Sequence, residues 1–442
     1  MKQIIACIFV LTFSASCVWN VSPEPSGKSI YTSDALTIFI TGNELGALKP
    51  CGCSGGQLGG LSRRAAVFNS VPKSKRLIID TGSLVKSQDE QDLIKFNIIL
   101  QAFRELDYDL VSLSEKDIEM GKNVGLLDDS DSGLNIISPY KDPDINFPAK
   151  FTKSLLLKGK TVIVTIEAVD AKSTTIEKVM REYEPGDSGI NILILNHCDA
   201  GIIDFIAKRA PLIDCIICPS ESDEPRVIGR TNKRPLVFSV GRFGRHVCKL
   251  QITDTTEGKG KPKLSFLAIP VEEDLKPEDS LVQLYKDYQQ LVRQRNLLEK
   301  YPRFILPEGL KYTGSESCKA CHEYEYAKWS PNAHAHAYAT LEREGTQFDP
   351  ECVICHVVGM KYSSGFISER KTGHLKNVGC ENCHGAGSEH IKTLGKAGFV
   401  EPKSSCLDCH TPEQSGDYAG NEASFRKKIV HWRELKANGN VK

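Results

Sequence analysis

The chain has 442 residues, of which 40% are hydrophobic and 25% charged, and its 56 Lys and Arg residues balance its 56 Asp and Glu residues. A chain of this length favours two domains joined by a linker over a single core. The balanced charge gives no electrostatic reason to expect a nucleic acid or an acidic membrane surface as partner, and the hydrophobic fraction is that of a globular protein.

Residues 1–17 have the order of a secretory signal peptide: Lys2, then an apolar stretch at 4–13, then small residues. The apolar stretch is too short to span a bilayer as a mature helix. The end of this segment, Ser-Ala-Ser-Cys17, resembles a lipobox, so Cys17 is a candidate lipid-bearing residue that would tether the protein to a membrane. Simple cleavage near Ala15, without lipidation, is the alternative. We predict a periplasmic or otherwise extracytoplasmic protein, either free or anchored as a lipoprotein.

After a predicted linker at residues 18–34, short apolar runs alternate with helical stretches such as residues 91–106. Runs of this length with β-branched residues indicate buried strands, and three- and four-residue apolar spacing indicates helices. Such alternation predicts a layered α/β domain over residues 35–271, with sites at its strand ends. The predicted strands are residues 36–41, 76–80, 109–114, 161–166, 191–196, 214–218 and 235–240.

Two motifs at these strand ends are Gly59-Gly60-Leu61-Ser62-Arg63 and Asp80-Thr81-Gly82-Ser83. They resemble the Gly-Gly-Leu-x-Arg and Asp-x-Gly-Asp motifs of the calcineurin-like metallophosphoesterases, in particular the periplasmic 5′-nucleotidase branch. The resemblance implies the α/β layered sandwich of that family for residues 35–271.

The positions that bind the two metals of that family carry other residues here. The resemblance places Asn43-Glu44-Leu45-Gly46 at the family's Asp-x-His-Gly, Ser83 at its bridging Asp, Glu115-Lys116 at its Asn-His pair and Ser220 to Ser222 at its closing histidines. A two-metal centre needs bridging carboxylates and imidazoles, and of these only His197 remains. We therefore predict that phosphoesterase activity is absent and that the domain is a docking or binding module.

Six cysteines lie outside both the signal segment and the repeated motif described below: Cys51, Cys53, Cys198, Cys215, Cys218 and Cys248. In an oxidising compartment, disulfides are the first explanation for such residues. A second explanation follows from the resemblance, because in the family fold several of these positions lie near the former metal site. Thiolates and one imidazole there would suit a soft or borderline ion such as Cu(I) or Zn²⁺. That second site would consist of Cys51, Cys53, His197, Cys198 and Cys218.

Residues 272–310 form a charged linker with helical spacing. One face of the expected helix would carry Leu281, Leu284, Tyr285, Tyr288 and Leu291. We predict that this helix packs across a domain boundary and serves as a connector, in preference to a regulatory role.

Four copies of Cys-x-x-Cys-His lie in the last predicted domain, residues 311–442. Two thiols at this spacing reach both vinyl groups of one haem, and the adjacent imidazole binds the iron as proximal ligand. Zinc ribbons are disfavoured because each pair here carries its own histidine. Apolar residues are sparse, so we expect a mostly α domain packed around four covalently bound c-type haems. The attachment residues are Cys318, Cys321, Cys352, Cys355, Cys380, Cys383, Cys406 and Cys409, and the proximal ligands are His322, His356, His384 and His410.

Five other histidines in this domain are candidates for the second axial position: His334, His336, His374, His390 and His431. Imidazole on both faces lowers the reduction potential relative to a His/Met pair and closes the iron to substrates. The stretches at residues 329–341, 352–359 and 378–387 resemble the tetrahaem cytochrome c family of ammonia oxidisers, which accepts electrons from hydroxylamine oxidoreductase. The resemblance implies three bis-histidine haems, with His334, His390 and His431 as distal ligands, and an open, five-coordinate haem on Cys352 and Cys355.

This chain departs from that family at His374, before the third motif. His374 would either close the second haem, giving a pure electron carrier, or leave it open. His336 is interpreted as a neighbour of His334 and not as a ligand. The sequence thus predicts an exported tetrahaem cytochrome that transfers electrons between redox proteins and is not itself an enzyme. The alternative is a multihaem oxidoreductase acting on a small nitrogen or sulfur compound at an open haem on Cys352 and Cys355.

Overall fold

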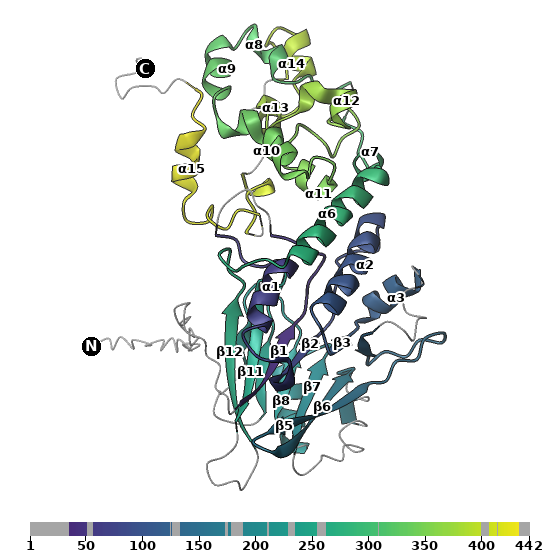
Figure 1. Cartoon of the computed structure of the whole chain (residues 1–442). Coiled ribbons are helices and arrows are strands. Elements are labelled where there is room, and N and C mark those ends of the chain that lie inside the picture. Colours follow the sequence, from purple (N-terminus) through teal and green to yellow (C-terminus); the bar gives the residue numbers. More distant parts are fainter. Residues whose placement is uncertain are drawn as a thin grey trace, which may run out of the picture. The chain divides into compact units, whose positions relative to one another are not determined.

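The computed structural model describes residues 35–50, 56–123, 125, 133–172, 176–177, 189–209, 212–228, 235–253, 262–307, 309–398, 406–412 and 414–432 (Figure 1). The predicted signal segment, Cys17, Cys51 and Cys53 lie outside these ranges. Within them, no helix combines the length and the apolar character that crossing a bilayer requires.

The first sheet has six strands in the order β12-β11-β1-β2-β3-β4. Strand β1 pairs in parallel with β2 and antiparallel with β11, so the sheet is mixed. The parallel half is joined by helices, as crossover connections require. Its strands are β1 (Ala35–Thr41), β2 (Arg76–Asp80), β3 (Leu110–Ser112), β4 (Asn135–Ile137), β11 (His246–Thr253) and β12 (Lys263–Pro270).

The second sheet also has six strands, in the order β5-β6-β7-β8-β10-β9. Strands β6, β7, β8 and β10 are parallel neighbours, and β5 and β9 add antiparallel edges. Its strands are β5 (Lys150–Leu157), β6 (Lys160–Val169), β7 (Ile190–Leu195), β8 (Cys215–Cys218), β9 (Arg226–Val227) and β10 (Leu236–Ser239).

Alternating side chains on the strands build separate cores on the two faces of each sheet. On β1, Leu36, Ile38 and Ile40 face the second sheet, in a core shared with Ile166 and Phe238. Phe39 faces the opposite way, into a core with the helices α1 (Leu61–Phe68), α2 (Glu90–Glu105) and α3 (Glu115–Asn123). A third core joins β7 and β8 to α5 (Ala200–Arg209). The result is a four-layer α/β/β/α arrangement, so the predicted layered sandwich is confirmed; we call it the sandwich.

Helix α6 (Asp279–Gln294) follows the sandwich and packs against it. Its apolar face contributes Leu281, Leu284, Tyr288 and Val292 to the core that also holds α2. The short helix α7 (Leu297–Lys300) continues the chain, and Leu298 belongs instead to a core with Tyr338 and Val353. A helix therefore lies where the linker helix was predicted, with its apolar face on the sandwich. The prediction was wrong for Leu291, which is exposed, whereas Val292 is buried in its place.

Residues 311–432, here called the haem-motif region, consist mainly of short helices, as predicted. The described part contains no named strand and one isolated β-bridge, between Val357 and Lys376, while a second bridge joins Tyr362 to Phe304 outside the region. Its elements are α8 (Glu316–Lys319), α9 (Glu323–Trp329), η2 (Ala333–His336), α10 (Ala337–Glu344), α11 (Pro350–Val353), α12 (Glu369–Thr372), η3 (Gly373–Leu375), α13 (Cys380–His384), α14 (Ser388–Lys392), η4 (Cys406–Asp408) and α15 (Glu422–Lys428).

A cluster of polar side chains is buried where β1, β2 and α1 meet. The guanidinium of Arg64 donates to Glu44 and, over 3.1 Å, to the hydroxyl of Tyr108. Thr41 Oγ1 lies 2.9 Å from the same hydroxyl and donates to Asp80 over 2.6 Å. Burial lowers the pKa of Arg64, but Glu44 and Tyr108 outweigh it and hold the pKa above its ordinary value. This cluster fixes the loop at residues 43–46 to the body of the sandwich.

The carboxyl group of Asp80 makes the stability of this cluster dependent on pH. Burial and the nearby Glu44 raise its pKa to about 8, whereas an Asp in an unfolded chain titrates near 4. Between these values the folded state keeps a proton that the unfolded state releases. The contribution to the free energy of unfolding is therefore full below about pH 4 and falls as pH rises through about 8, by up to about 1.4 kcal/mol per pH unit.

We accordingly expect Asp80→Asn to flatten the pH dependence of stability across this window. The measurement is urea unfolding of both proteins at several pH values from about 5 to about 8. An unchanged slope in the variant would show that Asp80 titrates normally.

Candidate haem-binding site and the strand ends of the sandwich

In the first and fourth Cys-x-x-Cys-His motifs, a turn of the backbone brings the histidine back towards the first cysteine. The amide of His322 donates to the carbonyl of Cys318 over 3.0 Å, and the amide of His410 donates to that of Cys406 over 2.8 Å. One such turn places residues i and i+4 on the same side of the backbone. A cysteine and an imidazole on one side are what attachment and ligation of a single haem require.

Three of the proximal histidines face one of the histidines predicted to be distal. Ring centroids are 6.0 Å apart for His322 and His390. They are 6.3 Å apart for His334 and His410, and again for His384 and His431. Two imidazoles that bind one metal from opposite sides, with metal–nitrogen bonds of about 2 Å, have centroids roughly 6 Å apart. The gap between each pair of rings therefore has the width that an iron atom needs, and the residues present fit c-type haem.

Hydrogen bonds to Nδ1, the ring nitrogen that would not bind iron, orient two of the imidazoles. The Nδ1 atoms of His356 and His431 lie 2.6 Å from the carbonyl oxygen of Ala337 and 2.8 Å from that of Ile429. A neutral imidazole that donates from Nδ1 to a carbonyl presents an Nε2 lone pair to a metal. Burial lowers the pKa of His356, which favours the neutral, ligating form. These contacts prepare both rings to ligate through Nε2.

Two other histidines occupy different positions. His374, in η3, has its ring against the main chain of Gly314, where a Cβ would lie 3.2 Å from His374 Cδ2. The neighbouring Leu375 accepts a backbone hydrogen bond from Val358, just after the second motif. His374 thus lies between the first and second motifs, and its ligation of the second haem stays a prediction. His336 shares η2 with His334, two residues away.

The cysteines of different motifs meet in two pairs. Cys318 of the first motif lies beside Cys380 of the third. Cys409 of the fourth lies beside Cys355 of the second. Because each cysteine is an attachment point, the first motif lies beside the third and the second beside the fourth.

The two variable positions inside the third motif hold the motifs together. Glu381 is 4% exposed, and its carboxylate accepts hydrogen bonds from the amides of Thr313, Gly314 and Gly387 at 2.8 to 3.0 Å. Asn382 donates over 2.8 Å to the carbonyl of Val357, directly after the second motif. Sequence reasoning missed both roles, since it treated these positions as spacers; a polar pair between two haem cysteines was the available signal.

In the sandwich, three residues at the expected metal-binding positions have left-handed backbone: Asn43 (φ 52°), Leu45 (φ 50°) and Ser83 (φ 60°). Such angles are uncommon outside glycine and are often found at functional sites. The loops that hold them are interlocked, since Asn43 N donates to Gly82 O and Leu45 N to Ser83 O. The backbone of these two strand-end loops is therefore held in one arrangement, and the side chains that it presents are those of Asn43, Leu45 and Ser83.

Two other polar side chains at these strand ends bind backbone carbonyl groups. Lys116 donates to the carbonyl of Lys86 over 2.8 Å, and the hydroxyl of Ser220 donates to the backbone carbonyl of Ser222 over 2.9 Å. Throughout the described residues, no three His, Cys, Asp or Glu side chains are grouped as a metal site would need.

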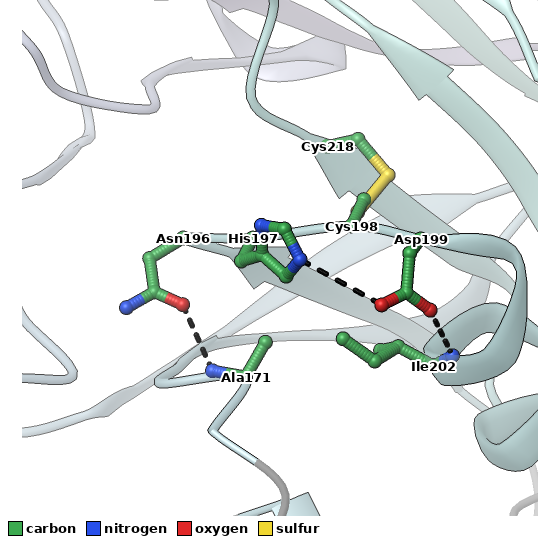
Figure 2. The surroundings of a disulfide bond; sticks show 7 residues. All are labelled: Ala171, Asn196, His197, Cys198, Asp199, Ile202 and Cys218. Carbon is green, nitrogen blue, oxygen red and sulfur yellow. Dashed lines mark hydrogen bonds and ion pairs between the residues drawn. A yellow bond between two sulfur atoms is a disulfide. The ribbon is translucent and has the colours of Figure 1, made fainter.

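Cys198 and Cys218 form a disulfide between the end of β7 and the end of β8 (Figure 2). Next to it, the exposed ring of His197 lies 3.7 Å from the carboxylate of Asp199, which also caps Ile202 at the start of α5. The metal site considered for this region needed thiolates at both cysteines, and a disulfide has none. For Cys198 and Cys218 the structure thus contains a disulfide, which was the first explanation given for these cysteines. Cys215 and Cys248 are buried free thiols in the core between the sheets, so a disulfide to either is absent among the described residues.

A family model described as cytochrome c554 and c-prime matches residues 317–385, which contain the first three motifs. The cytochrome c-554 of Nitrosomonas europaea is 26% identical over 149 residues, and the match covers 26% of this chain and 63% of the relative. The chain thus spans less than two thirds of the length of that curated relative. The C-terminal third resembles this cytochrome family, as the motifs had predicted.

Solved structures similar to the chain include the calcineurin-like phosphoesterase YfkN from Bacillus subtilis, with 13% identity, a TM-score of 0.44 and coverage of 58% of this chain and 97% of that one. Another is the 5′-nucleotidase precursor from Thermus thermophilus, with 14% identity, a TM-score of 0.43 and coverage of 71% of this chain and 68% of that one. These likenesses concern the fold.

Proposed function

We propose that the chain is an exported tetrahaem c-type cytochrome that passes electrons between redox protein partners, with the sandwich as a catalytically inactive docking module. The observation that carries the proposal is the set of imidazole pairs 6.0 to 6.3 Å apart, each containing the histidine of a Cys-x-x-Cys-His motif. A pair at this spacing can hold an iron atom on both faces, and closed irons exchange electrons and do not bind substrates.

The contacts between motifs support transfer of electrons within the chain. When bound, c-type haem supplies an iron that changes its charge by one electron. The protein's part is to keep the attachment points close and rigid. Cys318 meets Cys380 and Cys409 meets Cys355, while the buried Glu381 and Asn382 fix the segments around them. Haems attached at such points would be close neighbours, so an electron that enters at one motif can leave from another.

The chemistry at the strand ends of the sandwich supports its inactivity as a phosphoesterase. A two-metal hydrolase uses carboxylates and imidazoles to hold its ions and to generate hydroxide. Here the positions in question are Asn43, Leu45, Ser83 and Lys116, and the one histidine, His197, is solvent-exposed and paired with Asp199. A positively charged Lys116 side chain in this region would further disfavour a cation.

Three measurements test the proposal. Mass spectrometry of the protein matured by a cytochrome c assembly system is expected to show four haem additions per chain, and fewer would contradict the proposal.

Phosphatase assays with added Mn²⁺ or Zn²⁺ are expected to show no turnover above background, both for the unsubstituted protein and for His197→Ala. Metal-dependent turnover that disappears in His197→Ala would instead mean a working hydrolase. Binding of carbon monoxide or nitric oxide by the native protein would favour the alternative of an oxidoreductase with an open haem on Cys352 and Cys355.

A further inference from the structure

A buried carboxylate connects the second haem motif to the sandwich. Asp349 is 3% exposed and is the N-cap of α11, the helix that carries Cys352. Its Oδ1 accepts from the amide of Glu351 over 3.0 Å, and its backbone carbonyl accepts from the amide of Cys352 over 3.0 Å. Asp349 thereby fixes the first turn of the helix from which the second haem would be attached.

The other hydrogen bonds of this carboxylate come from outside the haem-motif region. Gln91, on α2 of the sandwich, donates to Oδ1 over 2.8 Å. Tyr288 and Gln289, on α6, each donate to Oδ2 over 3.0 Å. Tyr288 and Gln289 are 2% and 9% exposed, so these bonds lie out of water, where a charge is weakly screened. The sandwich and its linker helix thus supply three of the donors that hold Asp349.

A second charge contact reinforces this connection. Lys95, on α2, is 3% exposed, and its amine lies 2.6 Å from the carboxylate of Glu351, the residue before Cys352. Burial lowers the pKa of Lys95, but Glu351 outweighs it and the pKa lies above its ordinary value, so the amine is charged. Gly46 borders this side chain, because a Cβ there would lie 3.3 Å from the Lys95 amine. The loop at residues 43–46 therefore packs against the side chain of Lys95.

We propose that the sandwich sets the reduction potential and the position of the haem on Cys352 and Cys355 through Asp349 and Lys95, which are positioning residues for electron transfer. The inference rests on the proposed function, because it requires a haem at this motif. An oxidised haem carries one more positive charge than a reduced one. A buried carboxylate one helical turn from the attachment point favours the oxidised form, and a buried ammonium favours the reduced form.

The test is a spectroscopic redox titration of the full-length holoprotein and its variants. Asp349→Asn, which keeps the shape of the side chain, is expected to shift one of the haem midpoint potentials to a more positive value. Lys95→Met, made entirely within the sandwich, is expected to shift the same component to a more negative value. His356→Met identifies that component, because a methionine ligand raises the potential of the second haem only. Opposite shifts distinguish charge effects from a general loosening, which would move both variants the same way.

Glu381→Gln is the matched control, because Glu381 is also a buried carboxylate beside a haem cysteine but is held within the haem-motif region. It is expected to leave the second-haem component unchanged. The inference is overturned if Lys95→Met leaves that component in place, if both variants shift it in one direction, or if Glu381→Gln moves it as well. If Asp349→Asn does not fold, the Lys95→Met variant tests the inference alone. The inference then requires that Lys95→Met shifts the second-haem potential to a more negative value and leaves the other haem potentials unchanged. A holoprotein with four reversible haems and no shift would refute this inference only, whereas a protein without four haems would refute the proposed function itself.

Discussion

Arg64→Met is expected to lower the free energy of unfolding by about 3–5 kcal/mol, which is a large part of the stability of an ordinary domain. The side chains of Arg64 and Glu44 are both fully buried, and Arg64 also donates to Tyr108. Removal of the guanidinium leaves the carboxylate of Glu44 in the interior without its counter-charge. The expected loss is measured by urea unfolding followed by far-ultraviolet circular dichroism.

Two further variants test whether that loss comes from the unpaired, buried carboxylate of Glu44. The double variant Arg64→Met/Glu44→Gln is expected to recover part of the stability, because a neutral amide costs less to bury than an unpaired carboxylate. Lys300→Met is the control for an exposed ion pair, since its partner Glu90 and Lys300 itself are 41% and 56% exposed. Its effect should be much smaller. A loss in Arg64→Met no larger than that in Lys300→Met would show that the buried pair contributes little.

Removal of any one distal imidazole is expected to convert one haem per chain from low-spin to high-spin. The three variants are His334→Ala, His390→Ala and His431→Ala. Each removes the ring opposite a proximal histidine at 6.0 to 6.3 Å. An iron that loses its sixth strong ligand becomes high-spin and opens to small molecules. Electron paramagnetic resonance of the oxidised protein measures the change, and added imidazole should restore the low-spin signal.

His336→Ala is the matched control, because His336 lies in the same short helix as His334. It is expected to leave the spin state of every haem as it is in the unsubstituted protein. If His336→Ala produced the high-spin signal and His334→Ala did not, the assignment of the distal ligand in η2 would be reversed. If all three distal variants remained low-spin, the ring pairs would not be the ligand pairs.

Much of the fold was predictable because local patterns encode it. The seven predicted strands coincide with β1, β2, β3, β6, β7, β8 and β10, whose apolar runs are largely buried. The strands that were not predicted lie mostly at or near sheet edges. There, as in β5, exposed and buried residues alternate and the apolar signal is weaker. Strand β12, at an edge of the first sheet, has no buried apolar run and was missed for the same reason.

The sequence by itself determined the haem chemistry, because a covalent attachment motif is local: five consecutive residues contain both thiols and the proximal imidazole. It also identified which histidines remained as distal candidates, and it led to the prediction that most metal-binding positions at the strand ends of the sandwich carry other residues. Only the tertiary structure decided which distal ring faces which proximal ring, and that Cys198 pairs with Cys218. It alone revealed that Asp349 and Lys95 link the second motif to the sandwich. These are contacts between residues far apart in the chain, and such contacts form only when packing brings separate elements together, so no local pattern records them.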